Sequence, residues 1–414
     1  VAGLNGLADL DPSVEASADP DGGFTLRSGG AQPERFAAPA YRSASTWAVQ
    51  LSSAVGTARV QSATLRKAAP DDLYTAVLNG VTGTLDAFSR YEPPKRASES
   101  RARREGYGGI GVTIRDVEGT TVIQEVMPDT PAARGGLLAG DVITHADGVA
   151  LETLAREDRA QRLRGPVGVA VAVSIARKNV APFTVRIERD DIVPTTVYFE
   201  SDKDLPRFRI SSFSRNTAES LAEAIEKAEK SAGGLPGVVL DLRGNPGGYL
   251  TQAIDVADLF MDDGLVVAAR GRHPSSSNAY RAHMGALAVG KPVILLIDGH
   301  SASAAELLAA ALIDAGRAAA IGSVTYGKGS IQNLDELANG GELIITWSRM
   351  HAPSGYLLDG LGVRPTICTA GSLHDPATLI SEAERKGDAE ASSWRAYRAP
   401  DKILAQSLRT ICPK

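Results

Sequence analysis

Asp298-Gly-His-Ser-Ala-Ser-Ala-Ala-Glu306 is the stretch that decides the fold of this chain. It follows the apolar run Pro292–Ile297 and precedes an Ala- and Leu-rich segment, residues 307–315. A short apolar run, a glycine turn and an apolar helix form a strand–turn–helix unit, where α/β proteins place their chemistry. A serine at the mouth of such a helix lies beside unpaired backbone N–H groups and the positive end of the helix dipole. These features suit a nucleophile whose attack creates an oxyanion, so Ser303 is the candidate centre.

A second copy of the same unit precedes it. Residues 238–242 read as a buried strand that leads into Arg243-Gly-Asn-Pro-Gly-Gly248 and then into a helix over 250–260. If the two strands are parallel neighbours, both loops lie at the carboxyl edge of one sheet and face each other. The alternation of strands and helices starts near Arg207, with a strand predicted over 208–213 and an amphipathic helix over 217–232.

A serine hydroxyl is a poor nucleophile until a neighbouring group takes its proton. The helix after Ser303 carries the chain about 18 Å away, and the strand predicted over 317–322 returns it by roughly 20 Å. Thr325-Tyr-Gly-Lys-Gly-Ser330 is therefore predicted to lie near Ser303, with Lys328 as the base. A lysine is a base only when it is neutral, so the site has to lower its pKa. Gln332 could hold the neutral amine by a hydrogen bond.

Two other interpretations of these residues stay open. His300 lies three residues before Ser303, with Asp298 nearby, so a Ser/His/Asp hydrolase acting on small esters is one alternative. Three groups on one tight loop could hardly meet in line, which argues against it. Residues 322–328 also satisfy the start of a phosphate-binding loop, but Gly329 stands where Ser or Thr should bind magnesium.

The N-terminal part of the chain is predicted to be helical. Residues 45–63 and 71–88 carry apolar positions at helical spacing. Pro93 and Pro94 are predicted to stop the second helix, and the charged run Lys95–Glu105 to be a solvated linker. We expect this region to be a scaffold or a dimer arm.

Residues 107–190 read instead as a series of short strands. A glycine-containing turn, Gly108-Gly-Ile-Gly111, runs into an alternating strand, and further strands are expected over 121–126, 168–175 and 183–187. A short helix is predicted to start at Pro128-Asp-Thr-Pro131, followed by a strand and a turn within 138–148.

Composition limits the other possibilities. The 414 residues allow two to four domains, and a formal net charge of −5 argues against nucleic acid as the main partner. No run of 18 apolar residues is present, so no membrane span is predicted. The two cysteines, Cys368 and Cys412, are either two free thiols or a disulfide that would imply an oxidising compartment.

Taken together, the motifs resemble those of a carboxy-terminal processing protease, or tail-specific protease, of the Ser/Lys type. The matching pieces, in the family's order, are Leu240–Gly248, Ser301–Glu306, Tyr326–Gln332, Pro353–Gly355 and Gly360–Pro365. The glycine-containing turn at 108–111 and the P-x-x-P-A-x-x-x-G-x-x-x-G-D-x-I block at 128–143 are similar to a PDZ domain. Together with this block, the resemblance to the protease family covers about Asp71 to Thr369. The chain departs from the family pattern at His300, where Gly is usual, and at Ala305, where Ser is usual.

The resemblance implies a role for each matching residue. Ser303 would be the nucleophile, Lys328 the general base and Gln332 the residue that positions it. The N–H groups of Ala304 and of Gly247 or Gly248 would form the oxyanion hole. The loop Gly109, Ile110 and Gly111 would hold the terminal carboxylate of a substrate, and Arg164 would signal from the PDZ domain to the catalytic site. No metal or organic cofactor is implied.

We therefore expect a multidomain α/β protein in four parts. These are a helical N-terminal region and linker (1–106), a PDZ domain (107–190), a crotonase-like or ClpP-like α/β serine protease core (191–372) and a C-terminal tail (373–414). The expected function is a serine endopeptidase that cleaves proteins near unstructured C-terminal tails, with the PDZ domain recruiting the tail and gating activity. A catalytically idle peptide-binding scaffold is the rival. We expect a monomer, or a homodimer formed through the N-terminal region, and a periplasmic or otherwise exported protein whose signal peptide is not in this chain.

Overall fold

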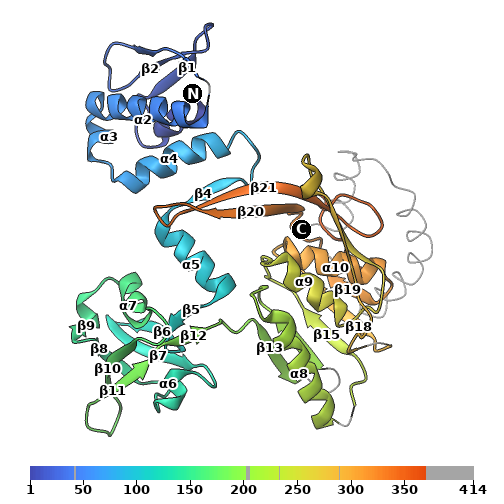
Figure 1. Cartoon of the computed structure of the whole chain (residues 1–414). Coiled ribbons are helices and arrows are strands. Elements are labelled where there is room, and N and C mark those ends of the chain that lie inside the picture. Colours follow the sequence, from blue (N-terminus) through green and yellow to red (C-terminus); the bar gives the residue numbers. More distant parts are fainter. Residues whose placement is uncertain (42, 202–205, 233, 289, 370–414) are drawn as a thin grey trace.

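A computed structural model describes residues 1–41, 43–201, 206–232, 234–288 and 290–369 of the chain. The predicted tail and Cys412 lie outside these residues. Figure 1 shows the chain as separate units: an N-terminal unit, a small β-rich domain and a larger α/β core, with the helix α5 leading from β4 to the β-rich domain. The multidomain α/β fold class is confirmed.

The N-terminal unit contains helices, as expected, but also an antiparallel sheet that the sequence did not reveal. Its sheet has the order β1-β2-β3. The helix α4 presses closely on α1, because Gly6 leaves no room for a side chain: a Cβ there would lie 2.1 Å from the Ala76 carbonyl oxygen. The elements of this unit are α1 (Ala2–Gly6), β1 (Glu15–Ala18), β2 (Phe24–Arg27), β3 (Glu34–Phe36), α2 (Ala44–Gln61), α3 (Ala63–Lys67) and α4 (Pro70–Thr82).

Two sequence predictions for the following segment are wrong. The helix α4 ends at Thr82 rather than Phe88, and the chain continues through a loop into the short strand β4 (Arg90–Glu92). The charged run predicted as a solvated linker is the helix α5 (Pro94–Glu105), with Pro94 at its first position. The physical reason is an ion-pair cluster: Arg101 and Arg104 both bind the buried carboxylate of Glu342, in the strand β21 (Glu342–His351).

The β-rich domain follows the predicted strands closely. Its main sheet has the order β11-β10-β8-β7-β6, and a separate pair joins β5 with β12. Its apolar core contains Ile110, Ile123, Ile143 and Val173. The elements are β5 (Tyr107–Gly109), β6 (Val112–Val117), β7 (Thr120–Val126), α6 (Pro131–Arg134), β8 (Val142–Ala146), β9 (Val149–Ala150), α7 (Arg156–Leu163), β10 (Ala170–Ala176), β11 (Phe183–Glu188) and β12 (Asp190–Ile192).

The α/β core is built on a sheet of order β13-β14-β15-β18-β19-β22, in which β14 to β22 run parallel. The two predicted strand–loop–helix units are β15 with α9 and β18 with α10, and their strands are adjacent, as expected. The elements are β13 (Val197–Ser201), β14 (Pro206–Ile210), α8 (Thr217–Ala232), β15 (Val238–Asp241), α9 (Leu250–Asp258), β18 (Val293–Ile297), α10 (Ala304–Asp314), β19 (Ala318–Gly322) and β22 (Ile367–Cys368).

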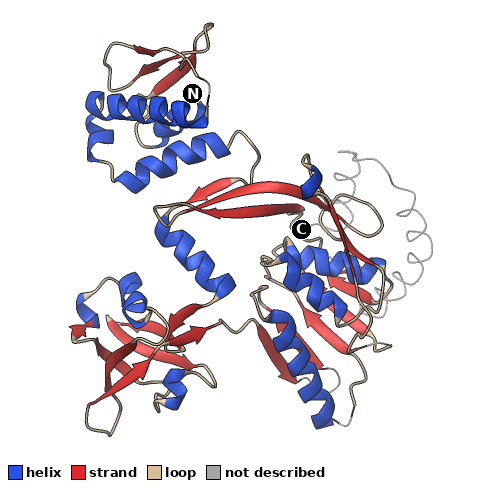
Figure 2. Cartoon of the chain, in the orientation of Figure 1, coloured by secondary structure: helices blue, strands red, loops and turns tan. Residues whose placement is uncertain are grey.

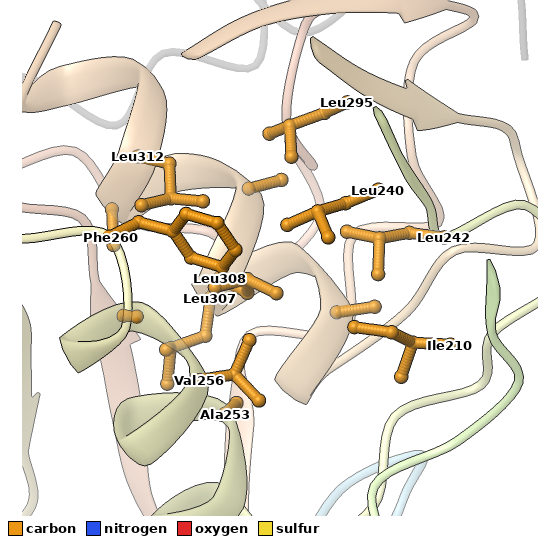
Figure 3. Close-up of a cluster of buried hydrophobic side chains, with 14 of the residues drawn as sticks. Ile210, Leu240, Leu242, Ala253, Val256, Phe260, Leu295, Leu307, Leu308 and Leu312 are labelled. Atoms are coloured by element: carbon orange, nitrogen blue, oxygen red, sulfur yellow. The ribbon is translucent and has the colours of Figure 1, made fainter. Parts of the chain in front are cut away.

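A second sheet, of order β17-β16-β21-β20 with β4 beside β21, covers the core (Figure 2). Its other strands are β16 (Leu265–Arg270), β17 (Asn278–Arg281) and β20 (Ser330–Glu336). The helix α10 contacts both β16 and β19, so it lies between the two sheets. Figure 3 shows the apolar cluster around it, in which Leu307, Leu308 and Leu312 meet Phe260, Leu240 and Leu295.

Two further findings concern the redox state of Cys368 and the possibility of a membrane span. Cys368 in β22 is disulfide-bonded. Within the described ranges, none of the helices combines the length and the apolar character needed to cross a membrane.

Candidate active site

Ser303 lies where β18 turns into α10, at the N-cap of the helix. Its backbone is in an unusual conformation, with φ 55° and ψ −114°, which residues other than glycine rarely adopt. A strained turn between a strand and a helix sets this serine apart from the regular backbone on either side, an arrangement also found around nucleophilic serines. The sequence predicts this position but not the strain.

The loop after β15 lies directly against this turn. Asn245 accepts a hydrogen bond from the Ala302 N–H at its carbonyl, and its side-chain amide donates to the Ile210 carbonyl. Gly247 approaches so closely that an added Cβ would lie 2.8 Å from the Ser303 Cβ and 3.0 Å from the Ala304 nitrogen. A side chain at Gly247 would therefore push the two loops apart.

Two backbone N–H groups on the loops that meet at Ser303 remain without a protein acceptor among the described residues. The Gly247 N–H is taken up by the Asn245 Oδ1 at 2.8 Å. Across the described ranges, neither Gly248 nor Ala304 donates its N–H to a protein acceptor. Of the two glycines that the sequence left open, Gly248 therefore has the uncommitted donor.

Lys328 is brought to this site by Glu306, a residue that the sequence analysis did not single out. The Glu306 Oε2 accepts hydrogen bonds from both the Ser303 N–H and the Lys328 N–H, each at 2.8 Å. Its Oε1 accepts from the Gly327 N–H and the Thr325 hydroxyl. One buried carboxylate thus joins the turn that carries the serine to the turn that carries the lysine. Its place three residues after the N-cap was the available sequence clue.

The carboxylate of Glu306 is fully buried. Burial raises the pKa of Glu306, because an ionised carboxylate loses its hydration there, and the four donated hydrogen bonds act in the opposite direction.

The amine of Lys328 is covered by a segment from the far N-terminal side of the chain. Its Nζ lies 5.5 Å from the centre of the Phe88 ring. Burial lowers the pKa of Lys328, the positive charge of Arg90 lowers it further, and Glu306 and Glu92 oppose this effect. These are the conditions that favour a neutral amine. The structure thus supplies the desolvation and the nearby cation that a lysine base requires.

The loop that holds Phe88 is itself fixed. Asp86 accepts hydrogen bonds from the backbone N–H groups of Phe88 and Ser89, each at 2.8 Å. The Ser89 hydroxyl accepts from the Thr346 N–H in β21. The Gln332 amide donates to the Phe88 carbonyl at 2.8 Å, so it holds this cover and is not hydrogen-bonded to the Lys328 amine. Nor does a hydrogen bond link the Ser303 hydroxyl to the Lys328 amine among the described residues.

His300 faces solvent, with 87% of its side chain exposed and its Nδ1 3.9 Å from Asp298 Oδ2. The carboxylate of Asp298 instead accepts from the backbone N–H groups of Gly244, His300 and Ser301. Asp298 therefore stabilises the loop, and the geometry does not support a Ser/His/Asp triad. In the described part of the chain, no group of three or more His, Cys, Asp or Glu residues is arranged to hold a metal ion.

The predicted binding residues lie apart from this site, in the β-rich domain. Gly109 pairs with Asp190, Ile110 is buried, and Gly111 has φ 82°. A Cβ on Gly111 would lie 2.2 Å from Thr130, so the turn requires glycine. The Arg164 guanidinium lies over the Tyr107 ring, 4.2 Å from its centre.

Comparisons with known proteins show which families the chain resembles. A family model described as Peptidase family S41 matches residues 207–369, and a PDZ domain model matches residues 99–176. A carboxy-terminal-processing protease of Bartonella bacilliformis is 36% identical over 328 residues, which cover 77% of this chain and 76% of the relative. A carboxyl-terminal-processing protease of Synechocystis sp. is 30% identical over 323 residues, covering 76% and 75%. Among solved structures, a photosystem II D1 C-terminal processing protease matches with 26% identity and a TM-score of 0.42, covering 72% of this chain and 81% of that one.

The role of Glu306 can be tested by Glu306→Gln. The amide replaces one acceptor oxygen by an NH₂ group, so two of the four donors lose their partner whichever way it turns. Each unsatisfied buried donor costs about 1–3 kcal/mol, and we expect a loss of about 2–5 kcal/mol in the free energy of unfolding, measured by urea denaturation. Glu226→Gln, at an exposed helix position paired with Lys230, is the matched control and should change stability by less than about 0.5 kcal/mol. Equal stabilities of the two variants would contradict the role of Glu306.

Proposed function

The chain belongs to peptidase family S41, and on that premise we propose that it is a serine endopeptidase that cleaves proteins near unstructured C-terminal tails. The observation that carries the proposal is that one oxygen of the Glu306 carboxylate accepts hydrogen bonds from the backbone N–H groups of both Ser303 and Lys328. Both curated relatives described above are named carboxy-terminal or carboxyl-terminal processing proteases. We extend that substrate class to this chain.

The proposed reaction begins when the Ser303 hydroxyl attacks the scissile amide carbonyl. Lys328, neutral before the attack, takes the hydroxyl proton and then gives a proton to the leaving amine. The N–H groups of Gly248 and Ala304 stabilise the oxyanion, an effect often worth about 3–4 kcal/mol of barrier per donor. Water then releases the acyl group from Ser303. The Lys328 side chain has to rotate toward the serine when substrate binds, since catalytic hydrogen bonds commonly tighten only in the substrate complex.

Gln332 supports this mechanism indirectly. Its amide fixes the Phe88 carbonyl, and the Phe88 ring covers the amine of Lys328. We propose that Gln332 positions Lys328 by holding this cover in place.

We also propose that the PDZ domain gates the site through α5. One side of this helix, at Glu99, Ala102 and Arg103, lines a cavity of the PDZ domain. Its other side binds Glu342 through Arg101 and Arg104, at the start of β21. The partner strand β20 begins at Ser330, two residues after Lys328. A tail bound in the PDZ domain therefore touches a helix that is fixed to the hairpin carrying the base.

An oxidising, exported location fits the disulfide at Cys368, because disulfides persist outside the reducing cytosol. Self-association through residues 1–106 stays a prediction.

The assignment of nucleophile and base predicts a specific pattern among three variants. Ser303→Ala and Lys328→Ala should each lower kcat/KM for a protein with an unstructured tail by about 10³-fold or more, since removal of either catalytic group leaves only binding and oxyanion stabilisation. His300→Ala should retain activity within a few-fold, because this side chain faces solvent. Full activity of Ser303→Ala would exclude Ser303 as the nucleophile, and no cleavage by wild type would leave the chain an idle peptide-binding scaffold. Loss of activity in His300→Ala with a mild effect of Lys328→Ala would favour the triad.

The pH dependence of the reaction tests the environment of Lys328. Because burial and Arg90 lower the pKa of this amine, its neutral fraction, and with it kcat/KM, rises as pH increases through the lowered pKa and then levels off. Phe88→Ala admits water, so the pKa returns toward its ordinary value and the whole profile moves to higher pH. Phe88→Leu keeps an apolar cover and should stay near wild type. A flat wild-type profile from about pH 5 to 9, or no displacement in Phe88→Ala, would rule out this role.

Gating through α5 is tested by comparing substrates with a free and an amidated C-terminus. The ratio of their kcat values measures the contribution of the PDZ domain. Arg101→Gln removes one of the two arginines that bind Glu342 and should reduce this ratio toward one, while binding of the tail persists. Arg96→Gln, at an exposed position on the same helix, is the control. An unchanged ratio in Arg101→Gln would exclude α5 as the connection.

A further inference from the structure

The PDZ domain carries a groove between β6 and α7 that has two chemically different halves. The half beside Gly111 is a cavity of about 310 Å³ with mostly apolar walls. Those walls include Ile110, Val112, Met127 and Leu163. This half suits an apolar C-terminal side chain next to the loop that would hold the terminal carboxylate.

The other half is basic. It is a cavity of about 350 Å³, and it shares Ile114, Ala160, Glu99 and Arg164 with the first, so the two are continuous. Its walls carry four arginines and two carboxylates: Arg115, Arg156, Arg159, Arg164, Glu99 and Asp116. Such an excess of positive charge stands out in a chain whose formal net charge is −5.

The arginines of this half differ in how far their charge is already neutralised. Arg159 is nearly buried and bonded to Asp116 at 2.5 Å and to the Gly119 carbonyl, so it is structural. Arg115 and Arg156 lie at exposed positions on opposite walls, and neither forms an ion pair within the described ranges. The charge available to an occupant therefore comes mainly from these two residues, with Glu99 of α5 as the opposing group.

A buried hydroxyl points to an occupant at the same place. Thr121 is 3% exposed, lines the basic half, and its Oγ1 has no hydrogen-bond partner among the described residues. Buried polar atoms are nearly always hydrogen-bonded, and an unsatisfied one in the wall of a groove is explained if a ligand supplies the partner.

The register of a bound tail follows from the topology. The carboxylate loop, 109–111, immediately precedes β6, so a tail that ends at this loop and adds to β6 runs antiparallel to it. One residue of tail then passes each residue of β6. Arg115, the fourth residue of β6, meets the tail roughly three to five residues before its end.

We propose that the basic half of this groove selects substrates whose tails carry acidic residues about three to five positions before an apolar C-terminal residue. The inference rests on the proposed function, in that the PDZ domain is taken to hold the tail. It adds the chemical class of tail that this chain recognises. Arg115 and Arg156 are the specificity-determining residues, and Glu99 sets a limit on how strongly acidic tails are attracted.

Binding to the Ser303→Ala variant of the 414-residue chain tests the proposal without cleavage. Fluorescein-labelled ten-residue peptides would end in one apolar residue and carry two Glu, two Gln or two Lys at the third to fifth positions before it. By fluorescence polarisation we expect the Glu peptide to bind about threefold to tenfold more tightly than the Gln peptide, and the Lys peptide more weakly still. The difference should shrink in 0.5 M salt, because exposed charge pairs are screened. Equal affinities of the Glu and Gln peptides would overturn the proposal.

Charge reversal locates the effect. Arg115→Glu and Arg156→Glu, each added to the Ser303→Ala chain, should abolish or invert the preference for Glu over Lys. Arg186→Glu, on the opposite side of the same domain, should preserve it. Glu99→Gln should strengthen binding of the Glu peptide. A preference that persists in both groove variants would contradict the assignment, even with cleavage of tailed substrates by wild type intact. Failure of wild type to cleave any tailed substrate would contradict the proposed function instead.

Discussion

The site depends on one buried carboxylate. Glu306 lies in the first turn of α10, and its two oxygens accept four hydrogen bonds from two segments that are separate in sequence. A surface carboxylate would be hydrated and would not need these donors, whereas a buried one is strongly destabilised unless all of them are present. The cost of burial therefore becomes a geometric constraint: the turn of Ser303 and the turn of Lys328 can only be placed where both reach the same acceptor. The close approach of Gly247 then fixes the third loop against them.

The chemical state of Lys328 has a different origin from its position. Its backbone is held within the α/β core, but its amine is covered by Phe88, in the loop before β4, and influenced by Arg90, the first residue of β4. The strand β4 pairs with β21, and Gln332 in β20 binds the Phe88 carbonyl. The low pKa of the Lys328 amine thus depends on the packing of the segment with Phe88 and Arg90 against the β20–β21 hairpin. In the proposed mechanism, the protease core supplies the nucleophile and the backbone donors, and the segment before the PDZ domain supplies the low polarity that a lysine base needs.

Sequence reasoning predicted the units in which apolar residues recur at regular spacing and glycines mark the turns. The strand before Ser303, its helix and the paired loop ending in Gly248 are of this kind, and the returning strand placed Lys328 correctly near Ser303. The helix α5 was missed because its residues are mainly charged, and its helical state depends on Arg101 and Arg104 meeting a glutamate that comes some 240 residues later. The cover by Phe88 was missed for the same reason, since a contact across the whole chain leaves no local pattern. The capping position of Glu306 was visible, but its second role, toward Lys328, was not.

The separation between position and chemical state limits how the enzyme can be switched. Because Glu306 ties both turns to one oxygen, movement of either backbone would leave a buried donor without its acceptor, which is costly. The Lys328 side chain has no such restraint, since its amine rests near the Phe88 ring without a hydrogen bond to Ser303 in the described structure. Rotation of this side chain therefore costs less than movement of the loops that carry it. In the proposed gating, a signal that travels through α5 to Glu342 would reach the β20–β21 hairpin, and it would act at the lowest cost in free energy by changing how Phe88 and Gln332 cover the amine. Gating of this kind would leave the oxyanion donors and the serine in place and would change only the access and the protonation of the base.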